Sequence, residues 1–179
     1  MENNIISIED LKMVGRPLGK MVQDHKLYAF IQETESLYIK PKLGDDLFIT
    51  LVENANEVNP ADGRLKILLE GGIYDPKDYG RDEPRRCFDG LKKAISYFVY
   101  AENVMSGDVE STRYGFNIKN DDYSNNITDK TRSNLYNNII DKAKGFLGDC
   151  LTFCKISGLI KDEGKSKINV GGCVIRKIG

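Results

Sequence analysis

The chain has 179 residues and a formal net charge of −1, with 40% apolar and 30% charged residues. This length and composition are typical of one globular domain with a real hydrophobic core. The near-zero net charge gives no general basic field for tight nucleic-acid binding. No apolar run is long enough to cross a bilayer, and the N-terminus lacks a signal-peptide pattern. We therefore expect no membrane partner and a protein kept in the cytoplasm where it is made.

A short helix is predicted near the N-terminus. Ser7 and Asp10 have the spacing of a capping box, with Asp10 in place of the usual glutamate. Gly15 and Pro17 then end the helical pattern. A longer helix is predicted for residues 24–40, where the inward stripe is Leu27, Phe30, Ile31, Thr34, Leu37 and Tyr38.

The ends of the longer helix are also indicated by the sequence. Asp24 is expected to cap it, and Pro41 and Gly44 are expected to break it. Asp45 or Asp46 then begins a third helix. Its predicted core face consists of Leu47, Phe48, Leu51 and Val52.

A short helix with Pro60 in its first turn is predicted next, because proline is tolerated there. Its apolar residues are Leu65, Leu68 and Leu69, and Gly71 and Gly72 end it. The segment from there to Pro84 is rich in proline, glycine and charge, so we interpret it as a surface loop.

A central helix is predicted to begin near Cys87 and to end at Gly107. Two apolar stripes with helical spacing lie side by side on it, which predicts a helix inside a bundle, contacted on two sides. The first stripe is Phe88, Leu91, Ile95, Phe98 and Met105, and the second is Ala94, Tyr97, Ala101 and Val104.

An extended arm over residues 108–127 is predicted to follow the central helix. Tyr114, Phe116 and Ile118 alternate with small or polar residues, which is typical of an extended arm or a hairpin strand. The C-terminal tail, residues 159–179, is rich in β-branched residues after Lys167. It is either a hairpin around Gly171 and Gly172 or one extended strand, paired with the arm or with a neighbouring subunit.

A long helix is predicted from Thr128 or Asp129 to Cys154. Gly145 and Gly148 lie inside it, and they indicate either close approach of another backbone, a kink, or simple tolerance. Its main apolar stripe is Leu135, Ile139, Ala143, Phe146, Cys150 and Phe153, widened by Ile140, Leu147, Leu151 and Cys154. Phe98 and Phe146 are expected to be buried between the central and the long helix.

These elements predict a mainly α fold: a helical bundle of about five helices, with an extended β-like arm and a short β-rich C-terminal tail. The helical domain is assigned to residues 1–158, and residues 159–179 are assigned to the tail. Gly158 thus marks the predicted boundary between the two.

The residue patterns that support catalysis are missing from the sequence, so we expect no enzyme and no cofactor. There is no phosphate-binding glycine loop and no G-x-S-x-G motif. His25 is the only histidine, and we interpret it as a surface residue rather than a base. Asp121 and Asp122 lack the spacing of a calcium site and are interpreted as solvated loop charges.

The four cysteines and one basic cluster have structural interpretations. No C-x-x-C pair is present, although Cys150 and Cys154 lie one helical turn apart. With a single histidine available, a zinc site is disfavoured and reduced core cysteines are expected. The four are Cys87, Cys150, Cys154 and Cys173. Arg81, Arg85 and Arg86 are interpreted as a solvated loop cluster, with a phosphate or acidic-protein contact as the alternative.

Three segments in this order resemble the head-to-tail connector (adaptor) proteins of tailed bacteriophages. The first, residues 29–48, reads as a helix, a Leu43-Gly44 turn and a helix with a bulky pair near its start. The second is the central helix with the Tyr-Phe-Val-Tyr-Ala sequence of 97–101, and the third is the arm over 112–124 followed by the long helix. The resemblance spans roughly residues 5–158 and is closest to versions in crAss-like and other phages of Bacteroidetes hosts.

The resemblance implies a structural virion protein without a catalytic site, assembled in the bacterial cytoplasm and located at the head-to-tail interface. Such adaptors form rings, usually of twelve copies, under the portal protein, contact neighbouring connector or tail proteins, and let DNA pass through the lumen without sequence-specific binding. The arm and the tail are the expected assembly interface. Its residues are Thr112, Arg113, Tyr114, Phe116, Ile118, Tyr123, Ile168, Val170, Val174, Ile175 and Ile178.

Two alternatives remain open at this stage. One is a small α-helical regulatory protein that binds DNA or a protein partner, which favours a basic recognition helix that the sequence does not provide. The other is a small enzyme whose site is assembled from scattered residues, including His25. The mass of the purified protein, alone and with a portal protein, separates a ring subunit from both alternatives.

Overall fold

The computed structural model describes residues 4–16, 22–55, 62–106 and 128–160, together with the backbone of 109–112 and 115–118. Within these ranges the fold is mainly α, as predicted. The helices are α1 (Ile8–Val14), α2 (Asp24–Thr34), α3 (Lys40–Leu43), α4 (Asp45–Asn54), α5 (Gly63–Glu70), α6 (Leu91–Ser106) and α7 (Asp129–Ile156). A π-helical turn, η1 (Glu35–Ile39), joins α2 to α3, and a 3-10 turn, η2 (Pro76–Tyr79), lies between the first two strands.

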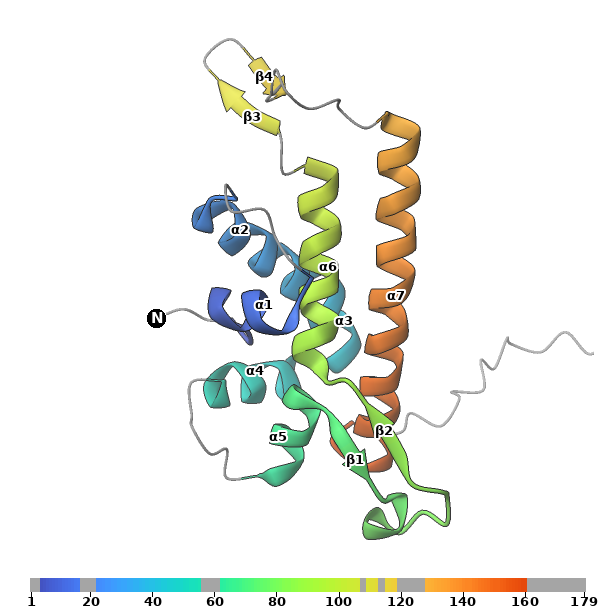
Figure 1. The fold of residues 1–179 in the computed structure, drawn as a ribbon. Coiled ribbons are helices and arrows are strands. Elements are labelled where there is room, and N and C mark those ends of the chain that lie inside the picture. The colour runs from blue at the N-terminus through green and yellow to red at the C-terminus, as the bar shows by residue number, and fades with distance from the viewer. Residues whose placement is uncertain are drawn as a thin grey trace, which may run out of the picture.

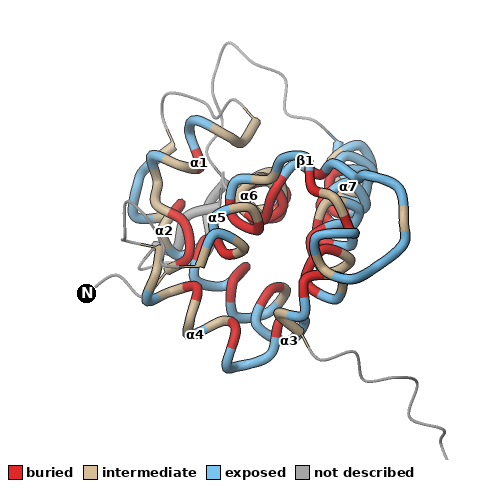
Figure 2. Tube along the Cα trace, turned by 90° about the horizontal axis from the view of Figure 1, so that it is seen from below, coloured by how far each residue is buried: buried red, intermediate tan, exposed pale blue. Residues whose placement is uncertain are grey.

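The two longest helices, α6 and α7, form an antiparallel pair, in which α7 runs along one side of the molecule (Figure 1). Helices α1, α2, α4 and α5 lie on one side of α6, and α3 lies near the lower half of α7 (Figure 1). Seen from below, the buried parts of α4, α5, α6 and α7 face a common centre (Figure 2). The core is therefore one continuous cluster around the α6–α7 pair.

Both apolar stripes of the central helix are largely buried, as expected for a helix that the rest of the bundle contacts on two sides. Leu91, Ile95 and Phe98 are fully buried, and Ala94 and Ala101 from the second stripe are buried with them. Met105 is an exception, because it lies in the last turn of α6 and is 45% exposed. Tyr97 and Val104 are partly buried and pack against the same core.

The start of the chain and the start of α7 follow the predicted capping chemistry. The Ser7 hydroxyl accepts a hydrogen bond from the Asp10 N–H (3.1 Å), and an Asp10 carboxylate oxygen accepts one from the Ser7 N–H (3.2 Å). Gly15 caps the C-terminal end of α1. Thr128 caps α7 by accepting a hydrogen bond from the Thr131 N–H.

Several predicted helix ends are wrong. Helix α5 begins at Gly63 with Asp62 as its N-cap, so its first turn does not contain Pro60. Gln23 occupies the N-cap of α2, and Asp24 is the first helical residue without a capping bond. Pro41 does not break the helix, because it lies in the first turn of α3, where no N–H bond is lost. The break occurs at Gly44, whose φ of 81° is in the left-handed region. Helix α4 then begins at Asp45 and buries Leu47 and Leu51.

A small hairpin replaces the surface loop predicted for 71–84 and the predicted start of the central helix at Cys87. Strand β1 (Gly72–Tyr74) pairs antiparallel with β2 (Arg86–Phe88), so Cys87 and Phe88 are in a strand and α6 begins only at Leu91. Gly71 and Gly90 make the hairpin base possible. Both have positive φ, and a Cβ on Gly90 would be 2.4 Å from the Gly71 nitrogen.

The hairpin is attached to α7 by aromatic rings. Phe88 stacks on Phe153 with ring centroids 5.1 Å apart, and Tyr74 meets Phe153 edge to face at 4.9 Å. Tyr79 of η2 adds a third ring at 6.0 Å. A buried aromatic cluster therefore closes the lower end of the core.

The chain still contacts the helical body two residues after Gly158, whose role as a domain boundary stays a prediction. The backbone N–H groups of Leu159 and Ile160 both donate to the Cys154 carbonyl oxygen, at 2.9 and 3.2 Å. Both residues also pack against the core. Arg64 in α5 donates to the Ser157 carbonyl oxygen (3.0 Å), which ties this end of α7 to the bundle. The described contacts with the helical body thus continue to Ile160.

The two glycines inside α7 are explained by tolerance rather than by close backbone approach. A Cβ built on Gly145 or Gly148 would meet no atom within 4 Å. Both residues are exposed on the surface of an uninterrupted helix. The alternative of a neighbouring backbone pressed against them is wrong.

Phe98→Ala should destabilise the fold far more than Phe146→Ala. Phe98 is only 1% exposed. Phe98→Ala should therefore lower the free energy of unfolding by about 3–5 kcal/mol, because the substitution leaves a cavity in the core. Phe146 is only partly buried, packing edge to face on Tyr97 at 5.0 Å, contrary to the prediction of full burial. Urea denaturation of both variants measures the difference. Equal losses would contradict this account of the α6–α7 interface.

Candidate assembly surface

A wide helical turn changes which side chains face the core between α2 and α3. The π-helical η1 holds five residues, Glu35–Ile39, where a regular α-helix was predicted. A π turn shifts the side chains that follow it around the helix axis. Leu37, predicted to face inward, is 68% exposed. Glu35, the first residue of the turn and four residues after the buried Ile31, is only 2% exposed. The inner face thus carries a carboxylate, and Leu37 lies outside it.

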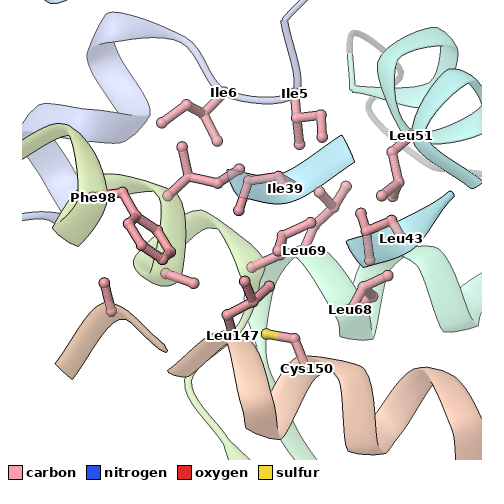
Figure 3. Close-up of a cluster of buried hydrophobic side chains, with 14 of the residues drawn as sticks. Ile5, Ile6, Ile39, Leu43, Leu51, Leu68, Leu69, Phe98, Leu147 and Cys150 are labelled. Carbon is pink, nitrogen blue, oxygen red and sulfur yellow. The ribbon is translucent and has the colours of Figure 1, made fainter. Parts of the chain in front are cut away.

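The buried Glu35 carboxylate binds the N-terminal segment. Its oxygens accept hydrogen bonds from the Ile5 N–H at 2.9 and 3.0 Å and from the Ile6 N–H at 3.1 Å. Burial raises the pKa of Glu35 to about 7, although the two backbone N–H groups favour its charged form. The side chains of Ile5 and Ile6 enter the same cluster as Ile39 and Phe98 (Figure 3).

A groove of about 320 Å³ lies beside η1, between α3 and α7. Its lining is mostly apolar, with the buried side chains of Phe98 and Leu147 at its base. The lining residues are Leu37, Tyr38, Lys42, Phe98, Lys144, Leu147, Gly148 and Leu151. We call this set the η1–α7 groove.

Two lysines and one exposed leucine lie around the η1–α7 groove. Lys42 of α3 and Lys144 of α7 are both exposed and line opposite sides. Neither ammonium group makes an ion pair within the part of the chain that the structure describes. Leu37 adds apolar surface at the edge. The groove is thus apolar inside and positively charged at its rim.

Tyr38 is held in place as one wall of the groove. Its ring stacks on Phe98 with centroids 4.7 Å apart and an interplanar angle of 10°. The Tyr38 hydroxyl donates to Glu102 Oε1 (3.1 Å), and the Tyr136 hydroxyl donates to the same oxygen (3.3 Å). The hydrogen bond with Tyr136, followed by burial and the Glu102 charge, raises the pKa of Tyr38. The phenol therefore remains a neutral donor.

The predicted arm contains a hairpin, one of the two forms expected. Strand β3 (Val109–Thr112) pairs antiparallel with β4 (Gly115–Ile118), and Ser111 lies opposite Phe116. The hairpin extends beyond the end of α6, away from the helical body (Figure 1). Thr112, Phe116 and Ile118 belong to it. The other predicted interface residues, Arg113, Tyr114, Tyr123, Ile168, Val170, Val174, Ile175 and Ile178, lie outside the described residues.

The η1–α7 groove was not foreseen from the sequence. Leu37 has the spacing of a buried helical residue, and the residue pattern around it does not predict a π-helical turn. Lys42 and Lys144 are single lysines in different helices, so their common position is visible only in the fold.

Two of the three described cysteines are in the core, and one is on the surface. Cys150 and Cys154 are buried core residues, as predicted, and burial raises the pKa of both thiols. Cys87 is exposed, which corrects the prediction of a core position. Across the described ranges, no three His, Cys, Asp or Glu side chains are grouped to hold a metal ion. None of the helices described here is long and apolar enough to span a membrane.

The fold defines a mainly α protein with two small hairpins, one attached to the core and one extending from it. Residues 39–155 match the model of DUF6712, a family of unknown function. This match covers more than half of the chain, so the protein belongs to that family. No curated protein and no solved structure matches the chain. The family region contains the α3, α6 and α7 residues of the η1–α7 groove, whereas Leu37 and Tyr38 precede it.

Glu35→Gln should remove a pH dependence from the stability of the fold. The pKa of Glu35 is raised from 4.5 to about 7 in the folded chain, so the folded state binds a proton more tightly than the unfolded state. Its contribution is fully present below about pH 4.5 and is lost as the pH rises through about 7, a change of roughly 3 kcal/mol. The measurement is urea denaturation of wild type and variant at pH 5 and pH 8.

Glu33→Gln is the matched control, since Glu33 is exposed two residues earlier in α2. It should leave the wild-type pH dependence unchanged. If the Glu35→Gln variant loses the same stability between pH 5 and pH 8 as wild type, another group is responsible.

Proposed function

We propose that the protein is a subunit of a head-to-tail connector ring of a tailed bacteriophage. In this role it docks under the portal protein, links the capsid to the tail and surrounds the DNA channel. Its partners are other copies of itself, the portal protein and neighbouring connector or tail proteins. The site of action is the virion, after assembly in the bacterial cytoplasm.

The observation that carries the proposal is the β3–β4 hairpin between the two central helices. A hairpin that extends beyond its own helical body (Figure 1) leaves its strand edges without partners from that body. Edges of this kind commonly pair with another chain. The position of this arm, after the central helix and before the long helix, is also one of the three parts of the resemblance to connector proteins.

The chemistry of the described surface supports a binding role. The η1–α7 groove is lined by apolar side chains, a tyrosine and two lysines, without a histidine, cysteine or carboxylate among its lining residues. His25 is exposed on α2 and is absent from that lining. An apolar groove with a charged rim is typical of a protein contact rather than of acid–base catalysis.

The direct test is assembly of the full chain with the portal protein from the same genome. Light scattering and electron microscopy of the purified protein, alone and with the portal, should show a ring of about a dozen copies bound to the portal. A monomer or dimer that retards duplex DNA would instead support the regulatory alternative. Catalytic turnover without assembly would support an enzyme.

A chain truncated after Ile160 should keep its helical content and lose connector assembly. A cut there keeps the described contacts at the end of α7, because Leu159 and Ile160 still bond to the Cys154 carbonyl oxygen. The residues removed include the β-branched tail segment 168–178, which is predicted to need strand partners from another subunit. Circular dichroism measures the helical content, and light scattering with the portal measures assembly.

The comparison variant carries Phe116→Ser and Ile118→Ser in the arm and keeps the tail. It should also retain the helical spectrum and fail to assemble. A truncated chain that still joins the portal in a complete ring would show that the tail is not an assembly element.

A further inference from the structure

The η1–α7 groove has the properties of a surface that another chain covers. Leu37 is 68% exposed at its edge, beside an opening of about 320 Å³ over Phe98 and Leu147. Apolar surface gathered around a concave site commonly marks a contact with another molecule. Gly148 deepens the groove, since a Cβ there would meet nothing within 4 Å. The shape therefore accommodates an aromatic or aliphatic side chain.

The two lysines at the rim indicate which residues should stand next to the anchoring side chain in the occupant. Lys42 and Lys144 stand on opposite sides of the groove, and neither has a carboxylate partner in the described part of the chain. An occupant with acidic residues beside an apolar one would provide those partners. The groove thus favours an anionic segment with an aromatic or aliphatic anchor.

The chain contains a segment with this composition between β4 and α7. Residues 119–127 read Lys-Asn-Asp-Asp-Tyr-Ser-Asn-Asn-Ile, which places Asp121 and Asp122 directly before Tyr123. Tyr123 can provide the anchor, and the two aspartates can provide the charges for Lys42 and Lys144. Tyrosine is one of the residues enriched at the centre of protein interfaces.

The far end of the groove is well separated from the hairpin of its own copy. The hairpin is beyond the end of α6 (Figure 1), where Arg132 Nη1 donates to the Met105 carbonyl oxygen (3.4 Å). Gly148 lies sixteen residues beyond Arg132, about 24 Å further along α7. The near wall is closer, because the Tyr38 and Tyr136 hydroxyls donate to the same Glu102 oxygen. We assign the occupant to a second copy, because the same contact then also joins the subunits of the proposed ring.

We propose that the η1–α7 groove binds residues 119–127 of a neighbouring copy, with Tyr123 inserted over Phe98 and the aspartates paired with Lys42 and Lys144. This inference rests on the proposed ring and specifies the contact that forms it. The arm end of one subunit meets the groove of the next, which is a head-to-tail contact. Repetition of such a contact closes a ring when the rotation between subunits permits it.

A charge-reversal cycle on the full chain tests the pairing. Lys144→Glu and Asp122→Lys, each alone, should raise the concentration at half-assembly by about tenfold, because each places like charges together. The two changes combined in one chain should restore assembly to within about threefold of wild type. Sedimentation velocity over a concentration series measures assembly. Lys142→Glu is the matched control, since Lys142 is exposed two residues earlier in α7 and does not line the groove, and it should have no effect.

A cysteine cross-link gives an independent test in a Cys87→Ser, Cys173→Ser background, which leaves only the buried Cys150 and Cys154. Leu37→Cys combined with Tyr123→Cys should yield covalent multimers on mild oxidation, whereas a cross-link within one chain would overturn the assignment to a second copy. Met13→Cys with Tyr123→Cys is the control, because Met13 is 84% exposed on α1 but does not line the groove. It should remain mostly uncross-linked.

The outcomes separate this inference from the proposed function. Rings that form normally in both single charge variants, without the Leu37 cross-link, overturn the groove contact and leave the connector proposal standing. Restored assembly and the specific cross-link, in a protein that does not bind the portal, uphold the groove contact and overturn the connector proposal. A chain that stays monomeric at every concentration overturns both.

Discussion

The hydrogen bonds between the Glu35 carboxylate and the N–H groups of Ile5 and Ile6 are the contact on which the centre of the molecule depends. A buried carboxyl group without donors is strongly unfavourable, so the N-terminal segment is needed to satisfy it. In return, Ile5 and Ile6 fill the core beside Ile39 and Phe98 (Figure 3). The segment before residue 39 is therefore part of the folding unit, although the family match begins only there.

The wide turn η1 begins at the buried carboxylate and borders the surface groove. Glu35 is its first residue and lies four residues after the buried Ile31, so the period of α2 already turns it toward the core. Later in the same turn, Leu37 lies at the groove edge, and Tyr38 stacks on Phe98 while donating to Glu102. Such π turns are rare and occur frequently at functional sites. The N-terminal segment, bound to Glu35, thus contacts the same turn that lines the candidate surface.

Sequence reasoning predicted the helical framework because its signals are local and repeated. The Ser7 cap, the stripe around Phe98 and the start of α7 all depend on neighbours within a few residues. The β1–β2 hairpin was missed because each strand has three residues with only one buried, so no alternation is visible. The η1–α7 groove was missed because Lys42 and Lys144 are brought together only by tertiary packing. Long-range neighbours of this kind leave no mark in a single sequence.

Helix α7 holds the two ends of the molecule at a set separation. Its 28 residues span about 42 Å, with the arm joined to its first turn and the aromatic cluster around Phe153 near its last. Loss of one residue within it would rotate everything beyond by about 100° and turn Phe153 away from that cluster. Insertions and deletions among DUF6712 proteins should therefore fall in the segments that flank α7. The length of α7 thus sets the distance between the arm and the aromatic cluster, and we expect this distance to be shared within the family.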